Sequence, residues 1–197
     1  GKVDNKVVTL NTDKGYVYIK LNKPRGITST TERHIKGNIV DFVGHSERIF
    51  HIGRLDKDSE GLLLLTSDGD IVNEILRAEN HHEKEYVVSV DKPLTKDFLK
   101  QMSEGVEILN QKTLPAKVSQ INDRTFKIVL TQGLNRQIRR MCETLGYNVK
   151  KLKRIRIMNI KLDGIKYGEW RDLTKEEFEE LTHSLAYTPK RDRMTSK

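Results

Sequence analysis

Alternating apolar and polar positions predict strands along much of the chain. From Gly15 to Asn22, β-branched and aromatic residues alternate with polar ones until a Lys-Pro-Arg-Gly turn follows. The short apolar run 62–66, bounded by Gly and Asp, is typical of a strand buried on both faces. The same patterns predict further strands at 48–52, 84–90, 105–109, 113–121, 125–131 and 149–162.

Five helices are predicted from capping residues followed by apolar residues three and four positions apart. Their expected starts are Asn38, the turn 67–70, Thr95, Asn135 and Thr174. Thr174 forms a capping box with Glu177, and the helix after the turn 67–70 should bury Ile71, Ile75 and Leu76. Strands dominate without the regular strand-helix alternation of a Rossmann sheet, so the pattern indicates an α+β fold.

The net charge of +8 is concentrated in one stretch of the sequence. Residues 131–161 hold nine Lys and Arg against one acid, Glu143, which leaves the rest of the chain neutral. A localised basic element is the electrostatic footprint of a nucleic-acid binder, and a solvated lysine-rich edge strand is the plainer alternative. We interpret the stretch as a phosphate-binding flank of a functional site.

Several kinds of chemistry are disfavoured by what the sequence lacks. One cysteine, Cys142, allows no disulfide framework or cysteine zinc site and fits a reducing compartment. It falls on the apolar stripe of its predicted helix, where a core residue is expected. The six histidines form no metal-ligand spacing, and phosphate-loop and dinucleotide motifs are absent, so we expect neither metal nor cofactor. No apolar run is long enough to span a membrane.

Four segments resemble, in the same order, the motifs of the RsuA-like family of ribosomal RNA pseudouridine synthases. They are Asn22–Gly26, His51–Gly69, Lys84–Tyr86 and Gly133–Met141, with the strand 149–157 after the last. Within that family the chain is most similar to the RluF type, which acts on large-subunit RNA. The resemblance implies a mostly antiparallel mixed sheet with flanking helices around a central RNA-binding cleft.

The resemblance also implies domain boundaries. A catalytic domain is expected over 15–186. Residues 1–14 would be a linker remnant after a missing N-terminal S4-type RNA-binding domain, and 187–197 a basic, flexible tail.

By resemblance, Asp56 is the catalytic aspartate, Arg139 the cation that keeps it ionised, and Tyr86 the residue that stacks on the uracil. A carboxylate can attack C6 or C1′ of the nucleotide or assist a glycal intermediate, and the sequence does not choose between these routes. Without the resemblance, Asp56 fits a turn residue, Tyr86 a packing aromatic, and Arg139 a partner of Glu143.

Uridine in folded RNA is stacked, so such an enzyme must flip it out. Arg54 is expected to enter the vacated space or to hold the flanking phosphate. The other residues expected to contact RNA are Asn22, Lys23, Lys84, Arg136, Gln137, Arg140, Lys151, Lys153 and Arg154.

These expectations describe a monomeric, cytoplasmic isomerase that acts on ribosomal RNA, foremost 23S RNA, with structured transfer RNA as a second candidate. A catalytically silent RNA-binding or ribosome-assembly protein on the same fold is the main alternative. A nuclease or glycosidase that uses Asp56 and Asp58 is disfavoured because no metal ligands accompany the pair.

Overall fold

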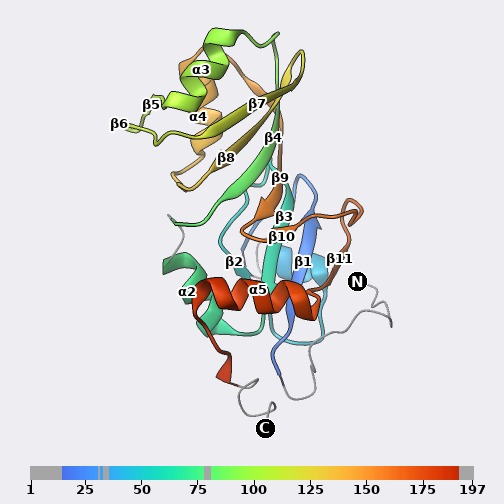
Figure 1. The fold of residues 1–197 in the computed structure, drawn as a ribbon. Coiled ribbons are helices and arrows are strands. Elements are labelled where there is room, and N and C mark those ends of the chain that lie inside the picture. Colours follow the sequence, from blue (N-terminus) through green and yellow to red (C-terminus); the bar gives the residue numbers. More distant parts are fainter. Residues whose placement is uncertain (1–14, 31, 33–35, 78–80, 191–197) are drawn as a thin grey trace. The chain divides into compact units, whose positions relative to one another are not determined.

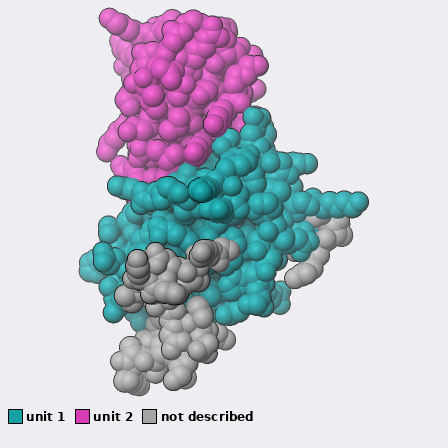
Figure 2. All heavy atoms as spheres, turned by 90° about the vertical axis from the view of Figure 1, so that its right-hand side faces the viewer, with its two compact units in different colours: residues 1–78, 159–197 teal, residues 79–158 magenta. Residues whose placement is uncertain are grey.

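The computed structural model describes residues 15–30, 32, 36–77 and 81–190. The chain divides into two compact units, coloured separately in Figure 2: unit 1 comprises residues 1–78 and 159–197, and unit 2 comprises residues 79–158. Each unit has its own hydrophobic core. The expected linker remnant at 1–14 lies outside the described residues.

Unit 1 is built on antiparallel strands (Figure 1). Strand β1 (Tyr18–Lys23) pairs with β3 (Glu60–Thr66) and with β11 (Trp170–Asp172), and β2 (Phe50–Ile52) also pairs with β3. Every residue of β3 is buried, as its continuous apolar run predicts. The core of this unit therefore forms around β1 and β3, whose inward side chains include Ile19 and Leu63.

The described part of unit 1 also contains the helices α1 (Ile39–Val43), α2 (Gly69–Arg77) and α5 (Lys175–Leu185). The predicted caps of α1 and α5 are present: the Asn38 side chain accepts a hydrogen bond from the backbone N–H of Asp41, and the capping box of α5 is complete. Ile71 and Ile75 are buried as predicted, but the prediction for Leu76 is wrong. Leu76 is 43% exposed because it follows Ile75 by one position, about 100° around the helix.

Asp68 joins distant parts of unit 1. Its fully buried carboxylate accepts a hydrogen bond from the Tyr18 hydroxyl at 2.7 Å, and it caps α2 by accepting backbone N–H groups. The Tyr187 hydroxyl lies 2.7 Å from Oδ2 of the same carboxylate. The segment expected to be a flexible tail is therefore attached at its first residue, and its part 191–197 lies outside the described residues.

Unit 2 is an antiparallel sheet with two helices. Strand β4 (Lys84–Val90) lies between β8 (Thr125–Leu130) and β9 (Val149–Ile157), and β7 (Lys117–Asn122) pairs with β8. The other elements are α3 (Lys96–Glu104), β5 (Glu107–Ile108), β6 (Gln111–Lys112) and α4 (Gln137–Thr144). One core cluster combines side chains from both helices and the sheet, among them Met102, Met141 and Phe126. The α+β class and the mostly antiparallel pairing are confirmed.

Several boundaries differ from the sequence prediction. The strand expected over 113–121 begins at Lys117, and the strand expected over 105–109 is only Glu107–Ile108. The start of α4 and the end of β9 also differ. The N-cap of α4 is Arg136 in a left-handed conformation, not Asn135. Asn135 does not cap the helix. Its backbone and side-chain oxygens accept hydrogen bonds from the Arg140 guanidinium at 3.0 and 2.8 Å. The single strand predicted over 149–162 is divided into β9 and β10 (Ile160–Lys161) by a turn after Ile157.

Candidate active site and RNA-binding residues

Asp56 lies in the turn between β2 and β3 of unit 1. The backbone N–H of Ser59 donates a hydrogen bond to the Asp56 carbonyl at 2.9 Å, which closes the turn. The buried residue Leu55 is held by Ser29, whose hydroxyl donates to the Leu55 carbonyl at 2.7 Å and accepts from the Leu55 N–H at 3.2 Å. Asp56 itself is half-buried. The hydrogen bonds of Ser29 and Ser59 fix the backbone that carries its carboxylate.

Lys23 holds the same turn from the inside. Its side chain is fully buried, and its ammonium group donates hydrogen bonds to the carbonyls of Pro24 at 2.9 Å, Asp56 at 3.2 Å and Ser59 at 2.8 Å. Carbonyl oxygens compensate for the loss of water around a buried cation. The sequence suggested that Lys23 contacts RNA, but its side chain has no exposed surface in this structure, and its hydrogen bonds position the Asp56 turn.

Asn22 positions a second loop, residues 162–169 between β10 and β11. Its side-chain amide donates to the Ile165 carbonyl at 2.8 Å, its backbone N–H donates to the Glu169 carbonyl at 2.9 Å, and its carbonyl accepts from the Gly168 N–H at 2.8 Å. Asn22 is buried, so its part in the site is to shape this loop.

The other residues expected to contact RNA differ in exposure. The exposed ones are Arg54, Arg136 and Lys151. The half-buried ones are Lys84, Arg140 and Lys153. Gln137 is buried, and its side chain accepts a hydrogen bond from the backbone N–H of Leu134, which supports the start of α4. The exposed cations are therefore the stronger candidates for phosphate contacts.

Tyr86 lies on β4 of unit 2, opposite Arg154 of β9. A β-bulge lies beside it: Glu85 opposes Arg156, so the register skips Ile155. The extra residue reverses the alternation of β9, which is why Arg154 is only 5% exposed whereas Arg156 is half-buried. Arg154 was expected on the cationic face, but it lies two residues after the buried Leu152 and shares its buried face, whereas the bulge puts Arg156 on the other face.

Arg156 links β9 to the beginning of β4. Its Nε donates to Glu85 at 2.8 Å, its Nη2 to Glu83 at 3.0 Å, and its Nη1 to the Met158 carbonyl at 2.8 Å. Hydrogen bonding to Arg156 is the main reason why the pKa of Glu83 and the pKa of Glu85 lie below the ordinary glutamate value. This ion-pair cluster fixes the backbone next to Tyr86.

Arg139 lies on α4 and is half-buried. The apolar stripe predicted for α4 comprises Ile138, Met141, Cys142 and Leu145. The first three are buried, whereas Leu145 is the C-cap and is half-buried. Burial raises the pKa of the Cys142 thiol to about 12, so this cysteine is a packing residue and not a nucleophile. Asp56 belongs to unit 1 and Arg139 to unit 2 with Tyr86, and their common role remains a prediction from their motifs.

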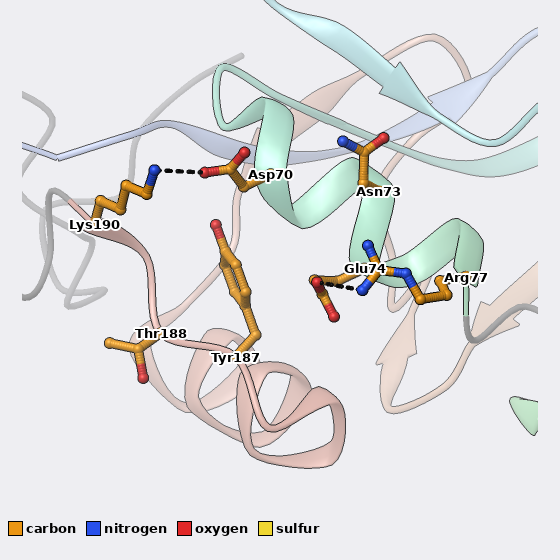
Figure 3. A pocket seen from close by; sticks show the side chains of 7 residues that line it. All are labelled: Asp70, Asn73, Glu74, Arg77, Tyr187, Thr188 and Lys190. Carbon is orange, nitrogen blue, oxygen red and sulfur yellow. Dashed lines mark hydrogen bonds and ion pairs between the residues drawn. The ribbon is translucent and has the colours of Figure 1, made fainter.

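Metal ligands and membrane spans are absent from the part of the chain that the structure describes. No group of three or more His, Cys, Asp or Glu side chains there could hold a metal ion, and no helix there is long and apolar enough to cross a membrane. A cavity of about 230 Å³ lies between α2 and residues 187–190 (Figure 3). Its charged side chains pair with one another, Arg77 with Glu74 at 2.9 Å and Lys190 with Asp70 at 3.8 Å, and it contains none of the predicted site residues.

Sequence reasoning missed two residues that support the site. Ser29 binds a residue 26 positions away, and Arg156 binds Glu85, which is 71 positions away. A serine in a loop and an arginine in a basic strand form no local pattern, so nothing in the sequence distinguishes them.

Comparison with known proteins identifies the class to which this fold and these residues belong. The family model for RNA pseudouridylate synthase matches residues 17–144. A crystal structure of a pseudouridylate synthase has a TM-score of 0.78 at 31% sequence identity, covering 85% of this chain and 74% of that one. The chain belongs to the RNA pseudouridylate synthase family, as the sequence motifs predict.

Two relatives of known name show which members of the family the chain resembles. The dual-specificity RNA pseudouridine synthase RluF of Escherichia coli strain K12 is 58% identical over 180 residues, which cover 91% of this chain and 62% of that protein. The ribosomal large subunit pseudouridine synthase B of Bacillus subtilis is 38% identical over 174 residues, which cover 84% of this chain and 71% of that protein. The predicted similarity to the RluF type is therefore confirmed, and the chain spans less than two thirds of the length of its RluF relative.

Proposed function

We propose that this protein isomerises a uridine to pseudouridine in ribosomal RNA of the large subunit. The observation that carries the proposal is the 58% identity over 180 residues with an E. coli protein named as a dual-specificity RNA pseudouridine synthase. The name of the B. subtilis relative supports the large subunit as the target. Structured transfer RNA is the candidate for a second substrate, and a ribosomal RNA substrate implies a cytoplasmic location.

The reaction breaks the N1–C1′ bond of the nucleotide and forms a bond between C1′ and C5 of the same uracil. The proton on C5 is lost and N1 gains one, so no oxidant, reductant or cofactor is consumed. A carboxylate begins this chemistry by attacking C6 or C1′, or by assisting a glycal intermediate. We assign this role to Asp56 from its position in the motif His51–Gly69, and the hydrogen bonds of Ser29, Lys23 and Ser59 support the assignment because they hold its turn in place.

The remaining roles follow from motif position and exposure. Tyr86 stacks on the target uracil, and Arg139 supplies the positive charge that keeps a desolvated carboxylate ionised. Arg54 is exposed and precedes Asp56 by two residues, so it takes the place of the flipped uridine or holds its flanking phosphate. Arg136 and Lys151 contact phosphates of the bound RNA.

The test is chemical mapping of pseudouridine in ribosomal RNA treated with the parent protein, with Asp56→Asn and with Asp58→Asn. Asp58 is the matched control because it is a half-buried carboxylate in the same turn. Asp56→Asn should form no pseudouridine while its RNA affinity stays within a few-fold of the parent, and Asp58→Asn should remain active. Activity in Asp56→Asn would refute the assignment. An RNA-binding parent that forms no pseudouridine would support the catalytically silent alternative.

A further inference from the structure

The loop 162–169 presents an aromatic ring at the surface of unit 1. Tyr167 in this loop is 56% exposed, more than any other large apolar side chain among the described residues. A single exposed aromatic residue is common on protein surfaces and indicates nothing by itself. The hydroxyl of Tyr167, however, accepts a hydrogen bond from the backbone N–H of Arg25 at 2.8 Å, so the ring is oriented although it is exposed.

The loop that carries Tyr167 is fixed by hydrogen bonds to Asn22 of β1. Asn22 forms the three hydrogen bonds to Ile165, Gly168 and Glu169 described above. Gly168 adopts a φ of 84°, a conformation that glycine reaches without strain, and it allows the chain to turn back directly after the tyrosine. An exposed ring on such a loop binds a flat partner with little further loss of conformational entropy.

A short path of hydrogen bonds connects Tyr167 with the turn of Asp56. Tyr167 is bonded to Arg25, and the next residue, Gly26, donates its backbone N–H to the carbonyl of Lys57 at 2.7 Å. Lys57 directly follows Asp56. The ring is thus held on the same rigid framework as the proposed catalytic carboxylate, and both are in unit 1.

Exposed cations lie next to Tyr167 in the chain and on the segments joined to it, although the loop also carries two exposed acids, Asp163 and Glu169. Arg25 and Lys57 are exposed on the two segments that this path joins, and Lys166, next to Tyr167 in the chain, is also exposed. An aromatic face among cations is the combination that binds unpaired nucleotides, since the base stacks on the ring and the cations meet the flanking phosphates.

From this arrangement we infer that Tyr167 is a stacking platform for an unpaired RNA base near the target uridine, with Arg25 and Lys166 as contacts for its phosphates. Stacking of this kind tolerates any base, so the subsite recognises an unstacked nucleotide and not a particular sequence. The inference rests on the proposed function for its RNA ligand, but binding tests it independently of catalysis.

The first experiment measures binding of a synthetic hairpin RNA with a uridine in its unpaired loop, using Asp56→Asn protein so that no reaction occurs. Adding Tyr167→Ala should raise Kd about tenfold with an unchanged slope of log K against log salt, because stacking releases no counterions. Tyr167→Phe keeps the ring and should stay within about threefold. Arg25→Ala and Lys166→Ala should each lower the salt slope by about one. Leu76→Ala, which removes another exposed apolar side chain of unit 1, should change nothing.

The second experiment replaces the loop nucleotides of the hairpin one at a time by abasic residues. At one position the abasic change should weaken binding to a protein with Tyr167 and have no effect on the Tyr167→Ala protein. The inference is overturned if no position shows this coupling. It is also overturned if Tyr167→Phe weakens binding as much as Tyr167→Ala, because the hydroxyl bonded to Arg25, and not the ring, would then be what matters. The coupling would remain measurable even if the parent formed no pseudouridine, so failure of this inference is distinguishable from failure of the proposed function.

Discussion

The ammonium group of Lys23 donates hydrogen bonds to the backbone carbonyls of Asp56 at 3.2 Å and Ser59 at 2.8 Å. One buried cation thereby joins both ends of the turn that presents the proposed catalytic carboxylate. Buried carbonyls cannot bond to water when their donor is lost. The turn therefore depends on the Lys23 ammonium group more than it would on a donor at the surface.

Replacing this ammonium by an apolar side chain of similar length should weaken the turn. Lys23→Met removes one donor from each of three carbonyls, of which that of Asp56 keeps the Ser59 N–H. We expect the free energy of unfolding to fall by about 2 kcal/mol, measured by urea denaturation followed by circular dichroism. The rate of pseudouridine formation should fall more than the RNA affinity. Lys57→Met, an exposed neighbour, should change stability by less than about 0.5 kcal/mol. A Lys23→Met protein as stable as the parent would contradict the proposed role.

The ion-pair cluster of Arg156 should make stability depend on acid. The pKa values of Glu83 and Glu85 are lowered in the folded protein, so their stabilisation is present above the ordinary glutamate pKa and is lost as pH falls through the lowered values. Arg156→Met should cost about 1 kcal/mol near neutral pH, a figure kept small because Glu83 is partly exposed to solvent.

Denaturation at a series of pH values measures this difference. The gap between parent and Arg156→Met should narrow as pH falls below the ordinary glutamate pKa of about 4.3 and should close once both carboxyls are protonated. Lys127→Met removes an outer, more exposed partner of Glu85 and should cost much less. A constant gap at all pH values would show that Arg156 stabilises the strands by packing and not by charge.

The buried thiol of Cys142 should affect stability at high pH. Its pKa is raised to about 12 in the folded protein, whereas the thiol of an ordinary cysteine in an unfolded chain has a pKa of about 8.5. Between these two pKa values the thiol is protonated in the folded state and largely ionised in the unfolded state. The free energy of unfolding therefore falls as pH rises, by up to about 1.4 kcal/mol per pH unit. The free energy of unfolding of Cys142→Ala should lack this decrease, which denaturation curves measured on both sides of about pH 8.5 would show. Equal pH dependence of the two proteins would contradict the assignment.

The cationic face of β9 should contribute salt-dependent RNA binding. Removing the charges of Lys151 and Lys153 should raise the Kd for ribosomal RNA fragments and reduce the slope of log K against log salt by about one for each phosphate that these lysines neutralise. Lys96→Ala with Lys100→Ala, two exposed lysines on α3 of the same unit, is the control and should leave the slope unchanged. An unaltered slope in the Lys151 and Lys153 variant would show that these two lysines do not contact RNA.

Local patterns in the sequence were sufficient wherever the deciding interactions lie within a few residues. The continuous apolar run of β3 predicts its complete burial, and the capping box of Thr174 and Glu177 forms as expected because its partners are three residues apart. The motifs around Asp56, Tyr86 and Arg139 are likewise contiguous strings, so the sequence alone was enough to predict the family.

Only the tertiary structure decided what several of these residues do. Lys23 looks like a surface cation in its motif, but the carbonyls that bind it include that of Asp56, 33 residues away. Arg154 looks like one more phosphate ligand in a basic strand, but it is buried opposite Tyr86, and a bulge against β4 puts it on the other face from Arg156. The physical reason is the same in both cases: alternation and motif spacing describe a segment by itself, whereas burial of a charge and strand register depend on which distant backbone supplies the partners.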